Sequence, residues 1–200
     1  TGGLVNIQAT NAPHMLFSED NVVAKFNHNK SQWGLFYNLS ARNFKKTYTD
    51  IDETYVLENK TIHRVQEGLH DQNKHFTHNI DLSYNLTEQD KYVFNVVFRN
   101  SVYDAPCLNQ SNKLYDAADA DNYIFSRLKN KQSSYTPSLD LYYQRTLPKN
   151  QMLTMSVTGT LMHTDNNRLY HEYTPQAEDL AMIETDVTGN KRSIIGEAIY

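Results

Sequence analysis

The sequence predicts an all-β fold, an antiparallel up-and-down meander that forms part of a transmembrane β-barrel. Three observations support this prediction: long runs in which apolar and polar residues alternate, short polar turns that recur about every 60 residues, and aromatic residues beside those turns. Successive side chains of a strand point to opposite faces, so alternation gives a sheet one apolar and one polar face.

The clearest alternation runs from residue 75 to residue 99 and predicts two strands joined by a short polar turn at 86–91. On the first strand, one face carries Phe76, His78, Ile80, Leu82, Tyr84 and Leu86, and the other face is wholly polar. On the second strand, Tyr92, Phe94, Val96 and Phe98 share a face. The apolar face must therefore contact either a second sheet or lipid.

Other runs predict further strands of the same meander at 4–8, 21–28, 33–44, 135–146, 151–162 and 193–200. The run 33–44 is the most regular, with Trp33, Leu35 and Tyr37 on one face. Turn residues at 29–31 and 147–150 separate neighbouring runs and, with the turn near Gln89, form one end of the meander.

Three long polar excursions at 45–74, 104–134 and 164–191 predict long loops at the other end, the first of which could instead hold strand extensions around a loop. Short turns at one end and long loops at the other are typical of outer-membrane barrels. A soluble sandwich has shorter strands, with turn signals every 8 to 12 residues or so.

Composition agrees with strands, because the chain has 14 Tyr and 8 Phe but only 7 Gly and 5 Pro. No run of about 18 apolar residues is present, which excludes a transmembrane helix. A mean hydropathy of −0.68 is still compatible with a barrel whose strands are half apolar. The net charge of −4 without a basic stripe argues against nucleic acid as a partner. Cys107 is the sole cysteine, so neither a disulfide framework nor a cysteine metal site is expected.

Several segments resemble the TonB-dependent outer-membrane receptors of Bacteroidetes. They are GGLVNI at 2–7, WGLFYNLSARN at 33–43, DLSYNLTEQDKYVFNVVF at 81–98, SLDLYYQRTLP at 138–148 and SIIGEAIY at 193–200. The resemblance covers essentially the whole chain. It implies a barrel of 22 strands or so around an N-terminal plug domain, in the outer membrane of a Gram-negative bacterium.

On this resemblance, residues 1–12 are the end of the plug or the first barrel strand, and residues 13–200 are the N-terminal part of the barrel. The chain is then expected to be a piece of a longer protein that takes up a scarce ligand, such as a siderophore, cobalamin or a glycan. The implied partners are outer-membrane lipid and TonB, which acts through a plug segment outside this chain. A surface lipoprotein that caps the barrel is also compatible with the resemblance.

Candidate site residues follow from the two faces. The ligand is expected at the loops 45–74, 104–134 and 164–191. A lipid-facing girdle is predicted at Trp33, Tyr84, Tyr92 and Phe94. Lumen-facing charges are predicted at Arg42, Asp81, Arg99 and Asp140. These charges could line a ligand path, but pairing with one another across neighbouring strands is the favoured interpretation.

Metal binding and catalysis have little support. Asp116, Asp119 and Asp121 form an oxygen-rich run that suggests calcium, but the EF-hand glycine and the closing glutamate are missing, so solvated loop charge is favoured. His75 and His78 are three apart and face opposite ways on a strand. No nucleophile elbow, Walker A or dinucleotide-binding pattern is present, so no cofactor and no enzymatic activity are expected.

Two other functions remain open. A soluble carbohydrate-binding β-sandwich could use the Tyr-rich strands as a sugar platform. An ungated outer-membrane porin would differ from a receptor in lacking the plug and the TonB-interacting segment.

Overall fold

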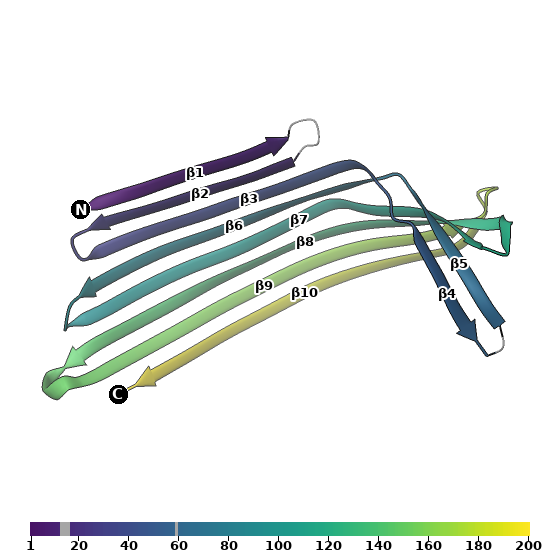
Figure 1. The fold of residues 1–200 in the computed structure, drawn as a ribbon. Helices are drawn as coiled ribbons and strands as arrows, with labels where there is room; N and C mark the ends of the chain where they lie inside the picture. The colour runs from purple at the N-terminus through teal and green to yellow at the C-terminus, as the bar shows by residue number, and fades with distance from the viewer. Residues whose placement is uncertain (13–16, 59) are drawn as a thin grey trace.

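The computed structural model describes residues 1–12, 17–58 and 60–200, and nearly all of them lie in one antiparallel β-sheet (Figure 1). The strands are β1 (Gly2–Ala12), β2 (Phe17–His28), β3 (Ser31–Thr47), β4 (Ile51–Leu57), β5 (Lys60–Leu69), β6 (Asp71–Glu88), β7 (Tyr92–Asp116), β8 (Asp119–Leu147), β9 (Gln151–Tyr173) and β10 (Asp179–Ile199). Within the described ranges, no helix is long and apolar enough to cross a membrane.

The sheet is an up-and-down meander, as the sequence predicts. Its order is β1-β2-β3-β6-β7-β8-β9-β10, and each neighbouring pair is antiparallel. The β4–β5 hairpin is inserted between β3 and β6, and β5 pairs with the far end of β7. The four strands therefore form one long, bent hairpin, with β3 and β4 in one arm and β5 and β6 in the other.

The three predicted short turns all lie at the same end of the sheet, which is the left end in Figure 1. Each contains a residue with positive φ: Asn29 (52°), Asp90 (61°) and Lys149 (64°). Asparagine and aspartate tolerate this left-handed conformation better than most residues. Pro148–Asn150 form a single 3₁₀ turn between β8 and β9. The turn chemistry thus explains where the strands reverse.

Two of the predicted loops, 104–134 and 164–191, are wrong as loops, because the structure continues the strands through them. In 45–74 the structure has the strand extensions that the alternative interpretation allowed. Segment 45–74 contains β4 and β5, segment 104–134 is the paired continuation of β7 and β8, and segment 164–191 is that of β9 and β10. The physical reason is that strand pairing uses backbone hydrogen bonds, which polar side chains do not interrupt.

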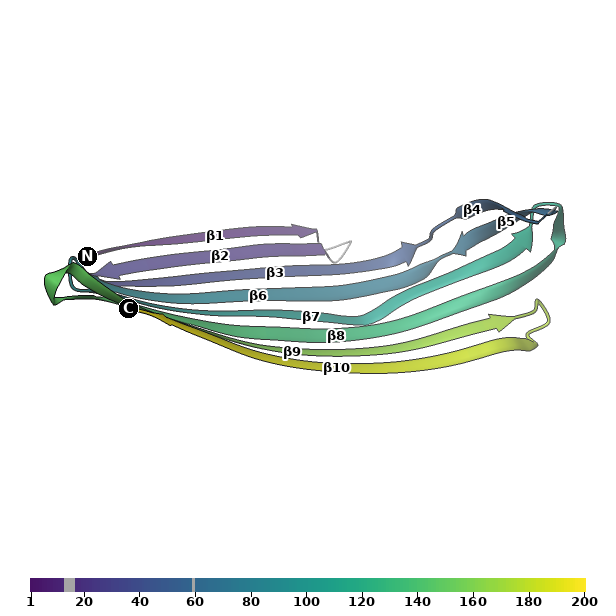
Figure 2. The same cartoon turned by 90° about the horizontal axis from the view of Figure 1, so that it is seen from below.

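Register shifts bend the sheet where these extensions begin. They lie between Phe44 and Thr47, between Lys74 and Phe76, and between Ala105 and Leu108. Such bulges kink a strand and increase its twist. Figure 2 shows the sheet nearly edge-on as one curved layer, with β4 and β5 turned away from it at one end.

A conventional core is almost missing from the described residues. Their buried hydrophobic residues are Ala24, Ala105 and Leu114, whereas Ile194 keeps 83% of its surface exposed. Apolar side chains of this size normally find cover in water-soluble domains. One face of the sheet therefore presents a large apolar surface to its surroundings.

Candidate functional site

The apolar face is continuous across all eight strands of the meander. The pairing registers place one row of directly opposed residues across it: Val5, Ala24, Leu35, Leu82, Phe98, Leu139, Gly159 and Ile194. Directly opposed residues of an antiparallel pair share a face. Every position in this row is apolar or glycine, so the row itself is uninterrupted. Asn100 and Arg192 lie on the same face, one row closer to the strand extensions.

Rows on either side of this one widen the face into a band, which we call the apolar band. On β8 it runs from Tyr135 to Tyr143, nine residues whose eight steps span roughly 26 Å at about 3.3 Å per residue. A transmembrane strand needs about 9 to 11 residues. The length of the apolar band is therefore that of a membrane-spanning strand.

The edge of the apolar band near the short turns is aromatic, where the sequence predicts a girdle. The ring centroids of Trp33 and Tyr84 are 4.3 Å apart, and those of Tyr84 and Phe94 are 6.4 Å apart. Tyr92 lies beside the turn, opposite Glu88. Tyr143, opposite Phe94, extends the row. The sequence analysis missed Tyr143 because its place depends on the β7–β8 register.

The other face, which we call the polar face, carries a ladder of hydrogen-bonded amides. Asn38 Nδ2 donates to Asn21 Oδ1 at 2.7 Å, and Asn79 Nδ2 donates to Asn38 Oδ1 at 3.3 Å. Ser101 Oγ donates to Asn79 Oδ1 at 2.7 Å. The ladder crosses four strands, β2, β3, β6 and β7. The side chains of the ladder satisfy one another's hydrogen-bonding groups, so the polar face does not need to pack against an apolar layer.

Three of the four predicted lumen-facing charges lie together on the polar face. Arg99 forms an ion pair with Asp140, and Asp81 lies directly opposite Arg99 on β6. Asp140 Oδ1 also accepts a hydrogen bond from Thr158 Oγ1 at 2.8 Å. The favoured interpretation, cross-strand pairing, thus holds for Arg99 and Asp140.

Arg42 has different partners. Its Nη2 atom lies 3.1 Å from Glu19 Oε2, and its guanidinium carbon lies 3.9 Å from the Phe17 ring centroid. Glu19 was not among the predicted site residues. It lies two residues before Asn21 on β2, so strand alternation places both on the polar face. Arg42 is held beside the β1–β2 hairpin, away from the Arg99–Asp140 pair.

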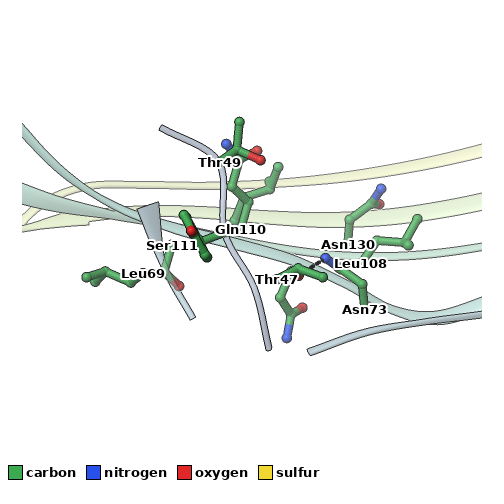
Figure 3. A pocket seen from close by; sticks show the side chains of 11 residues that line it. Thr47, Thr49, Leu69, Asn73, Leu108, Gln110, Ser111 and Asn130 are labelled. Carbon is green, nitrogen blue, oxygen red and sulfur yellow. Dashed lines mark hydrogen bonds between the residues drawn. The ribbon is translucent and has the colours of Figure 1, made fainter. Parts of the chain in front are cut away.

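A pocket of about 300 Å³ lies where β3 bends into β4, and Figure 3 shows its lining. Eleven residues line it: Thr47, Tyr48, Thr49, Leu69, Asn73, Leu108, Asn109, Gln110, Ser111, Leu128 and Asn130. The lining has no charged side chain; it combines amides and hydroxyls with three leucines and a tyrosine. Such a surface suits a neutral molecule that can both donate and accept hydrogen bonds.

Hydrogen bonds and close packing fix one wall of this pocket. Asn73 Nδ2 donates to Thr47 Oγ1, which in turn donates to the Asp71 carbonyl at 3.1 Å. The backbone of Thr49 approaches Gly68 so closely that a Cβ atom there would lie 2.6 Å from the Thr49 nitrogen. The connection between β3 and β4 is therefore held against β5 by its backbone.

One lining residue has unused hydrogen-bonding capacity. The Oδ1 atom of Asn130 is buried and has no hydrogen-bond partner among the described residues. An unpaired buried polar atom costs free energy, so a ligand or water that donates to it is favoured. The pocket brings together two of the three segments where the ligand is expected, 45–74 and 104–134.

The predicted metal candidates do not converge. Asp116 ends β7 and Asp119 begins β8, and Asp116 Oδ1 accepts a hydrogen bond from the Ala118 amide at 2.9 Å. Among the described residues, no three His, Cys, Asp or Glu side chains are placed to hold a metal ion. His75 and His78 occupy opposite faces, opposite Arg42 and Leu39 respectively.

An ion cluster that the sequence analysis missed joins two of the short turns. Glu88 lies 2.7 Å from the Lys91 ammonium and 2.9 Å from that of Lys30. The hydrogen bond from Lys91, followed by that from Lys30, lowers the pKa of Glu88 to about 2. These residues flank turns that are 60 residues or so apart in sequence, so only the β3–β6 pairing reveals the contact.

No protein-family model, curated protein or solved structure matches this chain. The two faces of the sheet and its pocket are therefore the basis for assigning a function.

Proposed function

We propose that this chain forms part of the wall of an outer-membrane β-barrel, with the apolar band against lipid and the polar face toward the lumen. The observation that carries the proposal is the uninterrupted apolar row from Val5 to Ile194, backed on the opposite face by a hydrogen-bonded amide ladder. Barrel strands alternate in this way between lipid and lumen.

Lipid explains the apolar band better than a second protein layer does. A sandwich buries both inner faces over a shared core, and its cover would hide residues such as Trp33, which is 54% exposed. An aromatic row at one edge of an apolar surface is typical of a membrane interface. These features favour a membrane wall over a soluble carbohydrate-binding sandwich.

Within this class, we infer a TonB-dependent receptor that takes up a scarce ligand such as a siderophore, cobalamin or a glycan. The segments that carry the resemblance form β1, β3, β6–β7, β8 and β10 of the sheet. Pairing of β1 with β2 along its whole length supports placing residues 1–12 in the wall rather than in the plug. The partners on this proposal are outer-membrane lipid, TonB through a plug segment, and a surface lipoprotein.

A pair of adjacent substitutions tests the orientation of the wall. Leu82→Arg places a charge in the middle of the apolar band and should cost about 2 to 4 kcal/mol of assembled stability. Asp81→Arg, on the polar face, should cost only about 0.2 to 1 kcal/mol through repulsion from Arg99. Assembly is measured by urea extraction and by heat-modifiable gel mobility of the protein in outer membranes. Equal defects in both variants would contradict the proposed orientation.

The receptor assignment is tested separately from the barrel. Cells that carry the full-length protein should lose uptake of its ligand when TonB is deleted or the proton gradient is collapsed. Uptake that continues unchanged under both treatments would instead identify an ungated porin.

A further inference from the structure

A second hollow lies beside the apolar band, where the sheet has a step. The β1–β2 hairpin ends part-way along β3, while β3 and β6 continue (Figure 1). The hollow has a volume of about 520 Å³, and most of its exposed lining is apolar. Ala41 and Phe76 form its apolar part, and Phe17, whose ring stacks on Arg42 of the polar face, borders it. We call this hollow the step groove.

The step groove is amphipathic along the strand direction. Ala41 and Phe76 are opposed to each other and lie one row beyond Leu39 of the apolar band. Asn43 and Lys74 form the next row outward and also line the groove. The apolar end of the groove therefore adjoins the band, and its cationic end lies farther from it.

The outer end of the step groove has donors that suit an anion. The Lys74 ammonium lies 5.0 Å from the Phe76 ring centroid, so its charge borders the apolar part of the groove. Asn43 Oδ1 accepts a hydrogen bond from Gln72 Nε2 at 2.8 Å, so its own Nδ2 group can still donate. Ammonium and amide donors both bind phosphate oxygens well.

None of the ion pairs among the described residues includes Lys74. Asp20 lies opposite Leu39 of the apolar band, two rows or about 13 Å along the strands from the row of Asn43 and Lys74. It accepts hydrogen bonds from Asn11 at 3.1 Å and Ser18 at 2.7 Å. Asp104 is opposite Phe76 on β7, which is the side of β6 away from the groove. The end of the groove at Lys74 is therefore its most positive part.

We propose that the step groove holds one anionic lipid of the surrounding membrane. Its acyl chain lies against Ala41 and Phe76, and its phosphate binds the Lys74 ammonium and the Asn43 amide. This inference rests on the proposed function, because only a wall with lipid against the apolar band exposes the groove to acyl chains. The polarity of the groove, apolar toward the band and cationic away from it, matches that of a lipid.

The test uses the protein reconstituted in nanodiscs that contain phosphatidylglycerol and phosphatidylcholine, with retained lipids counted by native mass spectrometry. Lys74→Gln should lower the preference for phosphatidylglycerol about fivefold, since one basic residue near an anionic surface contributes about that much. Lys129→Gln is the matched control, because Lys129 is an exposed lysine of the same face that lies on β8, outside the groove. It should leave the preference unchanged.

A second variant, Ala41→Trp, distinguishes the effect of filling the groove from the effect of removing the Lys74 charge. The indole should fill the apolar part, so that retention of both lipids is lost, whereas Lys74→Gln affects only the anionic one. If both variants retain lipid as the unaltered protein does, or if Lys129→Gln has the same effect as Lys74→Gln, the step-groove proposal is overturned while the barrel proposal stands. A protein that does not enter nanodiscs at all would overturn both.

Discussion

Two glycine-to-alanine substitutions offer a sharp test of how the β3–β4 connection is held over the pocket. At Gly68, an added Cβ atom would lie 2.6 Å from the Thr49 nitrogen, 2.7 Å from its oxygen and 2.9 Å from its carbonyl carbon. At Gly159, nothing lies within 4 Å of such an atom. Neither glycine has positive φ, so the difference between the variants is a difference in space.

The magnitude follows from the geometry. Ordinary contact begins at 3.4 Å, so the Thr49 backbone must retreat by about 0.8 Å, from 2.6 Å to 3.4 Å. Backbone atoms cannot rotate away as a side-chain end can, and overpacking of this kind costs about 1 to 3 kcal/mol. Both variants also gain about 0.4 to 1 kcal/mol because alanine restricts the unfolded chain. This gain cancels in the comparison and leaves a difference of about 1 to 3 kcal/mol.

Limited proteolysis measures the effect where it should arise. Because the strained contact is at the bend, Gly68→Ala should open the β4–β5 hairpin locally and speed cleavage within segment 45–74 about 5- to 150-fold. Fluorescence of Trp33, the sole tryptophan, reports unfolding near the start of β3, at the opposite end of that strand from the bend. Its urea midpoint should move much less than the cleavage rate. Gly159→Ala should leave the cleavage rate within segment 45–74 unchanged.

Equal cleavage rates in the two variants would refute a steric contact between residue 68 and the Thr49 backbone. Such a contact is also refuted if Gly68→Ala shifts the Trp33 transition while cleavage in segment 45–74 stays constant, because its effect would then not be local to the bend.

Two further predictions concern charge. Because the pKa of Glu88 is lowered from 4.5 to about 2, the stabilisation from its ion pairs is fully present above pH 4.5 and is lost as the pH falls through 2. An NMR titration of the Glu88 carboxyl group should therefore give a midpoint near 2, and Lys91→Gln should raise this midpoint. A midpoint of 4.5 in the unaltered protein would rule out the ion cluster. For the Arg99–Asp140 pair, a double-mutant cycle with Arg99→Gln and Asp140→Asn, read by urea unfolding, should give a coupling of about 0.2 to 1 kcal/mol. Additive effects would show that the pair contributes nothing.

The strands and the short turns were predictable because each leaves a local signal. Alternation between Trp33 and Leu39 on one face and Gly34 and Asn38 on the other is enough to orient β3. The reversal at Asn29 needs only a residue that tolerates positive φ, and asparagine is the natural choice there. Both signals lie within a few residues of the feature that they predict.

The polar extensions and the pocket leave no such signal. Strands β4 and β5 carry little apolar alternation; they pair with each other as a local hairpin, and β5 also pairs with β7, whose residues lie more than 40 positions along the chain. Asn73 and Asn130 line one pocket only because the bulge between Ala105 and Leu108 sets the register of β7 against β8. One residue more or less at that bulge would turn the outer half of β7 over.

The pocket and the apolar band occupy different lengths of the same strands. On β6, His78 lies at the edge of the band and Asn73 lines the pocket, about 16 Å farther along at 3.3 Å per residue. The pocket is also on the polar face, so its side chains do not contact the surface assigned to lipid. Under the proposed function, a change at Asn73 or Asn130 should therefore alter what the pocket binds without weakening insertion of the wall. The inner surface of the extensions can thus vary with the ligand, whereas the central row of the apolar band, from Val5 to Ile194, is constrained to stay apolar.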